Sequence, residues 1–356
     1  EQVGDNRPLD VFRSEKYFDL VRNFQRQSWM LLYLLGASPA VCSSFLQGRQ
    51  HQLQSCGHDT LYLPLATSLR MSSLGYQNSV QSDLKISYNG LDAYVRDLNH
   101  AIRTPYAGFE KLGLKNAKGQ YQQISTNLLQ IENEYYGLIR PKRTTNRGER
   151  PTTALSRRGV EYAELRCVDL NPFSPIGIDE TSAHFLEVFA LHCLLKDAPP
   201  FVDEEYHCLP RNQQLVVEQG RNPDLVLRFC GHSERLPELA HRTMDELAQI
   251  APLLDAAYGT QAYSAAIADE TAKLDEPERT LSARVLNGMK SADCSFIEFT
   301  KAQSNAHCSY FKNRPLSTNR AHEFSNAAAQ SHRDQAALES SDTLSFPDFL
   351  AAYFND

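Results

Sequence analysis

The stretch GVEYAELRCVDLNPFSP, residues 159–175, has the composition and alternation of a β-strand but carries charges that a plain core strand lacks. Successive side chains of a strand point to opposite faces, so Glu164 and Arg166 project from the same face, about 7 Å apart. They lie between Tyr162 and Val168, in a segment otherwise suited to burial. Two interpretations fit: a half-buried ion pair on a sheet face, or the floor of an active site. In the second, the carboxylate holds a cation and the guanidinium holds a substrate carboxylate.

The composition is that of a globular protein. The chain has 356 residues, of which 42% are hydrophobic and 22% charged, enough for one large domain or two ordinary ones. The net charge of -7 argues against general nucleic-acid binding and provides no basic face for anionic lipid. The most apolar run is WMLLYLLGA at 29–37, which is too short to span a bilayer and is predicted to be a buried helix.

The cysteines and the first residue bear on where the protein resides. Eight cysteines are scattered without a CxxC pair, a usage typical of reduced thiols in the cytoplasm. The chain begins with Glu1, and no signal-peptide pattern precedes it. We therefore expect either a processed N-terminus or a part of a longer product.

Periodicity separates a mixed first half from a helical second half. Apolar spacing predicts helices over 14–35 and 90–102, and alternation predicts a strand over 121–136, followed by a basic loop at 140–150. Asp179 is expected to cap a strong helix that continues to Leu195. Further helices are predicted at 212–219, 237–255, 260–274, 277–290, 295–312 and 320–338.

Standard nucleotide-binding motifs do not occur in the sequence: it has no GxxxxGK[ST] loop and no GxGxxG turn. If ATP is used, metal ions on strand carboxylates and basic side chains on the phosphates must hold it. The acidic segment 130–136, the basic loop and Glu164 fit that demand, although such loops are commonly just solvated. Arg70 and Tyr76, in an irregular segment, could reach a ligand or could be an exposed arginine and a packed tyrosine.

Four dense segments together resemble one known family. They are GASPAVCSSFLQG at 36–48, YLPLATSLRMSSLGYQNSVQSDL at 62–84, ISTNLLQIENEYYGLIRPKR at 124–143 and GVEYAELRCVDLNPFSPIGIDE at 159–180. The resemblance is to glutamate–cysteine ligase of the proteobacterial type, the first enzyme of glutathione synthesis, and it covers nearly the whole chain. It implies an α+β fold: part of a glutamine-synthetase-like antiparallel sheet forming an active-site floor, with an extensive helical C-terminal region. The implied division is a catalytic core at 1–178 and a mainly helical region at 179–356.

The resemblance also implies an activity. Such enzymes use ATP and Mg²⁺ or Mn²⁺ to join the γ-carboxylate of L-glutamate to the amine of L-cysteine through an acyl phosphate. We expect a cytoplasmic monomer that acts on these small molecules, with no nucleic-acid or membrane partner.

Site residues are carried over position by position. Glu164 is similar to a metal-binding glutamate of the family, and Arg166 to a ligand of the cysteine substrate. Arg70 and Tyr76 match the arginine and tyrosine of its SLR-x-x-x-LGY element, which line the cysteine site, and Tyr136 matches a tyrosine there. No residue is assigned as a catalytic group.

Two further expectations concern other parts of the chain. We propose phosphate contacts for the basic run at 140–143, through Arg140, Lys142 and Arg143. Relatives carry cysteines at spacings similar to Cys208 and Cys230, which leaves open either a regulatory disulfide or two unpaired thiols.

The sequence departs from the family pattern at its start. The family begins with roughly a further third of chain, holding a GxERE-type strand and other metal-binding glutamates, and no such strand precedes Glu1. We therefore expect this chain to be the C-terminal two-thirds of a ligase, inactive alone. The alternative is a non-catalytic amino-acid-binding or interaction protein derived from the ligase.

Overall fold

A computed structural model describes residues 7–75, 80 and 84–355 of the chain. One long, buried helix runs through the fold. This helix, α1 (Leu9–Leu34), begins directly after Pro8, and all its side chains from Ser28 to Leu34 are buried. A helix that is apolar on every side needs protein around it rather than solvent. The helix predicted at 14–35 is thus confirmed, with an earlier start.

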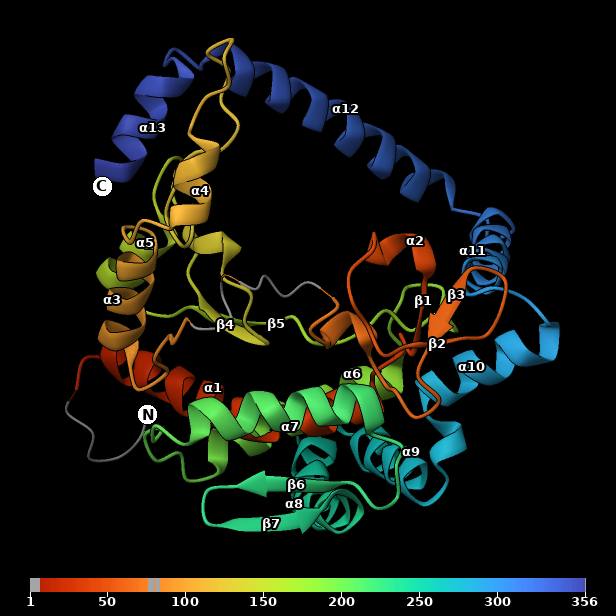
Figure 1. The fold of residues 1–356 in the computed structure, drawn as a ribbon. Helices are drawn as coiled ribbons and strands as arrows, with labels where there is room; N and C mark the ends of the chain where they lie inside the picture. Colours follow the sequence, from red (N-terminus) through yellow and green to blue (C-terminus); the bar gives the residue numbers. More distant parts are fainter. Residues whose placement is uncertain (1–6, 76–79, 81–83, 356) are drawn as a thin grey trace.

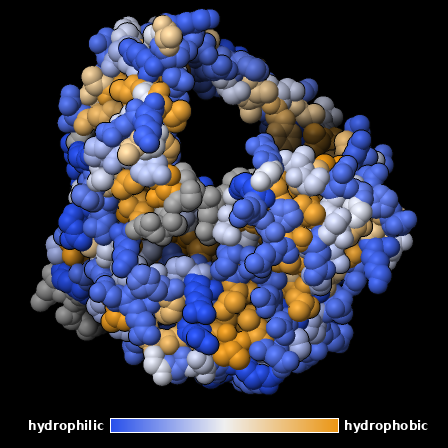
Figure 2. Space-filling view, in the orientation of Figure 1, coloured by the Kyte–Doolittle hydropathy of each residue, from blue (hydrophilic) through white to orange (hydrophobic). Residues whose placement is uncertain are grey.

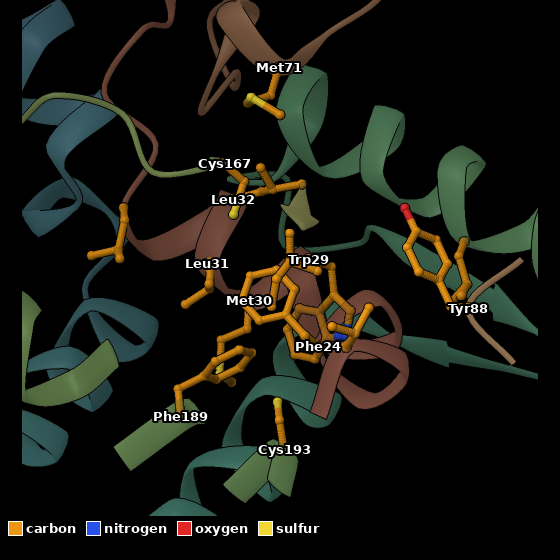
Figure 3. Close-up of a cluster of buried hydrophobic side chains, with 14 of the residues drawn as sticks. Phe24, Trp29, Met30, Leu31, Leu32, Met71, Tyr88, Cys167, Phe189 and Cys193 are labelled. Carbon is orange, nitrogen blue, oxygen red and sulfur yellow. The ribbon is translucent and has the colours of Figure 1, made fainter. Parts of the chain in front are cut away.

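Helices from the second half of the chain enclose α1. They are α6 (Glu180–Leu195) and α7 (Glu205–Gln219), which pack on α1, with α8 (Leu236–Tyr258) and α9 (Ala262–Asp275) packed on α6. Phe24 of α1 meets Phe189 of α6 edge to face, with ring centroids 5.7 Å apart. Figure 3 shows both rings in one apolar cluster with Trp29 and Met30. One core therefore joins the segments on either side of residue 178, and the predicted division there stays a prediction.

The start of α6 agrees with the sequence prediction. The Asp179 side chain accepts a hydrogen bond from the Ser182 amide at 2.8 Å, as an N-cap does. Because this cap lies shortly after the 159–175 stretch, it sets the point at which the chain passes from that stretch into the helical region.

The strands form three small antiparallel sheets. The first orders β1 (Ala40–Cys42), β3 (Thr60–Tyr62) and β2 (Gln54–Ser55), and the last pairs β6 (Val226–Phe229) with β7 (His232–Arg235). Between them in sequence, β4 (Ile139–Lys142) pairs with β5 (Tyr162–Leu165), and the register places Arg140 opposite Glu164. The strand predicted at 159–175 is confirmed only over Tyr162–Leu165, in its first half, and its partner overlaps the run predicted to be a basic loop.

The strand predicted over 121–136 is wrong. This segment is irregular and ends in a short 3₁₀ helix, η3 (Glu132–Glu134). Side chains take over the hydrogen bonds that a strand ladder would make: Asn127 Nδ2 donates to the Ile102 carbonyl at 2.6 Å, and Gln130 Oε1 accepts from the Ile124 amide at 2.8 Å. Asn and Gln compete with regular structure in this way, which an alternation pattern does not report.

The remaining helices complete the body and form a C-terminal arm. The body contains α2 (Ser43–Leu46), η1 (Leu69–Met71), α3 (Leu91–Ala101), α4 (Ala107–Leu112), α5 (Pro151–Arg158), η4 (Pro277–Arg279) and α10 (Leu281–Ala292). The arm contains α11 (Phe296–Lys312), α12 (Thr318–Ser340) and α13 (Phe346–Asn355). Figure 1 shows α12 spanning from α11 to α13 across the top of the molecule, and Figure 2 shows a wide hollow beneath it. Within the described ranges, none of the helices combines the length and apolar composition that a bilayer span requires.

Candidate active site

The β4–β5 hairpin places acidic and basic side chains on neighbouring strands. Glu164 and Arg140 are register partners, and Lys142 Nζ lies 3.7 Å from Glu164 Oε2, too far for a hydrogen bond. The Glu164 side chain is 40% exposed, yet its Oε2 is shielded from solvent. Among the described residues, neither this oxygen nor Arg140 Nε has a hydrogen-bond partner. Buried polar atoms are rarely left unsatisfied, so both point to a ligand.

Positive charge accumulates at this end of the hairpin. Burial, and after it the nearby charge of Arg166, lowers the pKa of Arg140, which keeps its charge at neutral pH. Arg140 Nη2 donates to the Asn133 carbonyl at 3.0 Å, which ties the strand to η3. Two guanidinium groups that repel each other provide a field that favours an anion, although Glu164 partly offsets the charge of Arg140.

A cavity of about 310 Å³ opens beside this cluster. Its polar lining includes Glu132, Asn133, Arg140, Lys142, Arg143, Thr144, Thr145, Thr152 and Tyr162. The predicted phosphate-contact residues thus lie together on one wall. Because Arg140 and Lys142 sit on a strand rather than on a mobile loop, this wall is rigid.

A second group forms around Arg70, which follows Leu69 in η1. Arg70 Nε donates to Asp169 at 2.5 Å and Nη1 donates to the Tyr136 hydroxyl at 3.0 Å. Nη2 donates to the Val168 carbonyl at 2.9 Å. The structure therefore brings together the SLR element, the end of the 124–143 segment and the 159–175 stretch, as the family resemblance predicts.

Arg166 differs from Arg70 because its guanidinium has no hydrogen-bond acceptor among the described residues. Its guanidinium carbon lies 4.8 Å from the centre of the Tyr136 ring, a cation–π contact that orients the side chain. No acceptor within the described part of the chain takes a hydrogen bond from this group. A planar fork held over an aromatic ring and otherwise unpaired is suited to a bidentate carboxylate.

The other predicted positions are placed only in part. Tyr76 lies outside the described residues. Cys208 and Cys230 are both free thiols, and they interact across the boundary between α7 and the β6–β7 hairpin. Burial, with the neighbouring Cys230 second, raises the pKa of Cys208 to about 11. Disulfide formation between them stays a prediction.

The carboxylate of Glu164 on β5 is the candidate ligand for a metal ion at this site. Within the described ranges, no cluster of three or more His, Cys, Asp or Glu side chains has the arrangement of a metal site. Mg²⁺ commonly keeps several waters and binds through one or two carboxylates plus substrate phosphates. The shielded, unpaired Oε2 of Glu164 fits one such ligand, beside a wall suited to phosphates.

Comparisons with known proteins agree with the geometry. The glutamate–cysteine ligase family model matches residues 1–216. Glutamate–cysteine ligase of Alcanivorax borkumensis is 48% identical over 357 residues, covering 99% of this chain and 68% of the relative. The chain belongs to the glutamate–cysteine ligase family. The ligase of Hahella chejuensis, 46% identical with the same coverage, agrees.

Solved structures place the fold in the same family. Glutamate–cysteine ligase of Francisella tularensis in complex with AMP superposes with a TM-score of 0.89 at 33% identity, over 96% of this chain and 67% of that one. A bifunctional glutathione synthetase from Pasteurella multocida shares the fold, with a TM-score of 0.63 at 21% identity, over 88% of this chain and 34% of that one. The family and the α+β fold class expected from the four segments are thus confirmed for this ligase-family chain.

Sequence reasoning missed three buried residues of this region. Asp169 lies within the 159–175 stretch but was not singled out, because its partner Arg70 is 99 residues away in sequence. Arg150 and Glu132 were seen only as part of a basic loop and an acidic segment. Their pairing, with Arg150 1% exposed, is a tertiary contact that no local spacing signals.

Proposed function

We propose that this protein takes part in ATP-dependent ligation of L-glutamate, through its γ-carboxylate, to the amine of L-cysteine, the first step of glutathione biosynthesis. The observation that carries the proposal is the unpaired Arg166 fork over Tyr136, beside the Arg140 wall, in a chain of this family. These two regions, at Arg166 and at Arg140, match the two kinds of anion that the reaction must bind: a substrate carboxylate and phosphates.

The chemistry divides into two transfers. A γ-carboxylate oxygen of glutamate attacks the γ-phosphorus of ATP, and ADP leaves with the bonding electrons. The amine nitrogen of cysteine then attacks the acyl carbon, phosphate leaves, and the amine loses a proton. Both steps concentrate negative charge on phosphoryl oxygens, so fixed positive charge stabilises them.

The chain's own residues have separate tasks in this scheme. Arg166 holds the cysteine carboxylate through two parallel hydrogen bonds and so directs the amine toward the acyl carbon. Arg140, Lys142 and Arg143 bind phosphate oxygens along the cavity wall. Glu164 is the protein ligand of a Mg²⁺ or Mn²⁺ ion, which supplies charge neutralisation on the phosphates when bound.

The setting of this activity is also part of the proposal. Reduced thiols and small charged substrates suit a cytoplasmic enzyme, and we propose that it acts as a monomer. The test is an assay of the full-length natural product that contains this chain, with glutamate, cysteine, ATP and Mg²⁺, in which γ-glutamylcysteine and ADP are quantified by mass spectrometry. Equal amounts of the two products support the proposal; ADP without dipeptide contradicts it.

A second candidate is a protein that binds cysteine without making a bond. It is favoured by the finding that, among the described residues, no group of three or more His, Cys, Asp or Glu side chains is arranged to hold a metal ion. Calorimetry with cysteine separates the two candidates: binding without any dipeptide in the assay supports the second.

A further inference from the structure

Asp169 is a nearly fully buried carboxylate that the proposed mechanism does not use. It is 4% exposed, and both oxygens are engaged. Oδ1 accepts from Arg70 Nε at 2.5 Å, while Oδ2 accepts from the Ala37 amide at 2.8 Å and the Ser38 hydroxyl at 2.7 Å. This one side chain therefore ties the 36–48 segment to η1 and to the end of β5.

The guanidinium of Arg70 has all of its donors directed at protein atoms. An arginine has five N–H groups. Nε donates to Asp169, Nη1 donates to Tyr136 Oη at 3.0 Å and the Arg166 carbonyl at 3.3 Å, and Nη2 donates to the carbonyls of Arg166 at 3.3 Å and Val168 at 2.9 Å. No N–H is left over for a substrate carboxylate. Arg70 therefore acts on its neighbours rather than directly on a ligand.

Those neighbours are Tyr136 and Arg166, the residues for which the family resemblance implies contact with cysteine. Arg70 holds the hydroxyl of Tyr136, and the ring of Tyr136 carries the Arg166 guanidinium 4.8 Å from its centre. Arg70 also holds the backbone carbonyl of Arg166. Arg70 thus orients the Arg166 guanidinium in two ways, through the Tyr136 ring and through the Arg166 backbone.

From this geometry we infer that Asp169 is a positioning residue for the carboxylate site of the amino-acid substrate. Asp169 fixes Arg70, Arg70 fixes Tyr136 and the backbone of Arg166, and these present the Arg166 fork to an α-carboxylate. The inference rests on the proposed function only in naming that substrate as cysteine. A buried pair with no role but stability would leave cysteine affinity unchanged once the protein is folded.

Asp169→Asn is the variant that separates these roles. Whichever way the amide is turned, its NH₂ group faces another donor, either Arg70 Nε–H or the Ala37 amide. The substitution therefore weakens the hydrogen-bonded ion pair between residue 169 and Arg70 with almost no change in side-chain volume. We expect the dissociation constant for L-cysteine, measured by calorimetry on the whole protein, to rise at least about tenfold, with ATP affinity unchanged.

Asp179→Asn is the matched control. Asp179 is a part-buried carboxylate that accepts from the Ser182 amide and from Asn171 Nδ2, both at 2.8 Å, and it does not contact Arg70. We expect it to lower the melting temperature without changing cysteine affinity. If Asp169→Asn does not fold, Ser38→Ala removes one donor to Asp169 and the acceptor of the Arg70 backbone amide, and it should weaken cysteine binding by about threefold.

The outcomes separate the inference from the proposed function. Equal cysteine affinity in the unmodified protein, Asp169→Asn and Ser38→Ala overturns the inference and leaves the proposed function intact. An unmodified protein that binds no cysteine overturns the proposed function. The positioning step can also be measured directly through the Arg70 Nε–H signal in nitrogen-edited NMR, which is assigned by its loss in Arg70→Lys. We expect this hydrogen to be protected from solvent exchange in the unmodified protein and to lose that protection in Asp169→Asn. Unchanged protection overturns the inference whatever the ligand.

Discussion

Arg150 is the largest fully buried side chain of the protein, and its charge is balanced within the core. Its Nε and Nη2 donate to Glu132 Oε1 at 2.9 and 2.7 Å, and the Thr152 hydroxyl donates to the same oxygen at 2.6 Å. Tyr353 of α13 donates to the other oxygen at 3.3 Å. Because Glu132 and Thr152 also line the 310 Å³ cavity, this cluster supports part of the cavity lining.

Removing the charge of Glu132 should therefore be costly. In Glu132→Gln the Arg150 guanidinium stays buried without its counter-ion, and we expect the free energy of unfolding to fall by about 3 kcal/mol. Urea denaturation followed by circular dichroism measures this loss. The exposed pair Arg320–Glu323 provides the control, since Glu323→Gln should cost less than about 0.5 kcal/mol. Similar losses in the two variants would contradict a buried, charged Arg150.

His192 makes stability depend on pH. It is buried on α6, its Nε2 donates to Glu246 Oε2 at 2.7 Å, and it also faces Lys196. Burial, the largest cause, lowers the pKa of His192 despite the opposing effect of Glu246. The folded state thus binds this proton less readily than the unfolded state, so stability should fall as pH drops below about 6.5.

Replacing this histidine tests that assignment. His192→Gln keeps a hydrogen-bonding side chain but cannot titrate, so the melting temperature should decline less between pH 7 and pH 5 than it does in the unmodified protein. An equally steep decline in both proteins would show that other groups control stability in this range.

The residues of the site were only partly predictable from sequence. Glu164, Arg166 and Arg70 stand in segments whose charges are anomalous for their surroundings, and the structure brings them to one region. The pairing of Arg70 with Asp169 spans 99 residues and depends on the whole fold, so no local pattern carries it.

At the scale of elements, long helices could be predicted from the sequence and short strands could not. Helices such as α6 and α8, with 16 and 23 residues, carry several turns of apolar periodicity and were predicted close to their bounds. Strands of two to four residues, such as β2 and β6, are too short for alternation to be recognised. β4 overlaps the run predicted to be a basic loop, and it contains Pro141, which a central strand would not tolerate but the edge strand of a two-stranded hairpin does.

The boundary between α7 and the β6–β7 hairpin should respond to oxidation. Cys208 lies on α7, Cys230 lies in the turn after β6, and the two thiols interact. We expect diamide to form a disulfide that raises the free energy of unfolding by about 3 kcal/mol, from the entropy of the closed loop.

Peptide mapping and thiol alkylation measure this bond. Because the pKa of Cys208 is raised to about 11, its thiolate is scarce at neutral pH, so the bond should form faster as pH increases. Cys230→Ser should abolish the stabilisation. Two thiols that stay open to alkylation after diamide treatment would contradict the expectation.

At the scale of the whole molecule, stability is unevenly distributed. α1 is buried along most of its length, whereas α12 has no buried residue over its 23 residues. A helix of that length without packing is marginally stable in water. The arm returns to the body at α13, where Phe346 meets Tyr121 with ring centroids 5.1 Å apart.

Hydrogen–deuterium exchange should reproduce this contrast. We expect amides of α12 to exchange within seconds and those of α1 to stay protected for hours, since their opening approaches global unfolding. Comparable protection in the two helices would mean that α12 packs against a surface in solution. Sequence periodicity predicted that α12 is a helix, but its position over the hollow follows from the contacts of α11 and α13.

The central claim is that Arg166 receives the carboxylate of cysteine. L-cysteine and cysteamine, which lacks that carboxylate, are titrated calorimetrically into the unmodified protein and into Arg166→Lys. Lysine keeps the charge but loses the planar fork, so the unmodified protein should prefer cysteine over cysteamine at least about tenfold, and the variant should lose most of that preference. The same preference in both proteins would contradict the account, because the carboxylate would then be bound elsewhere.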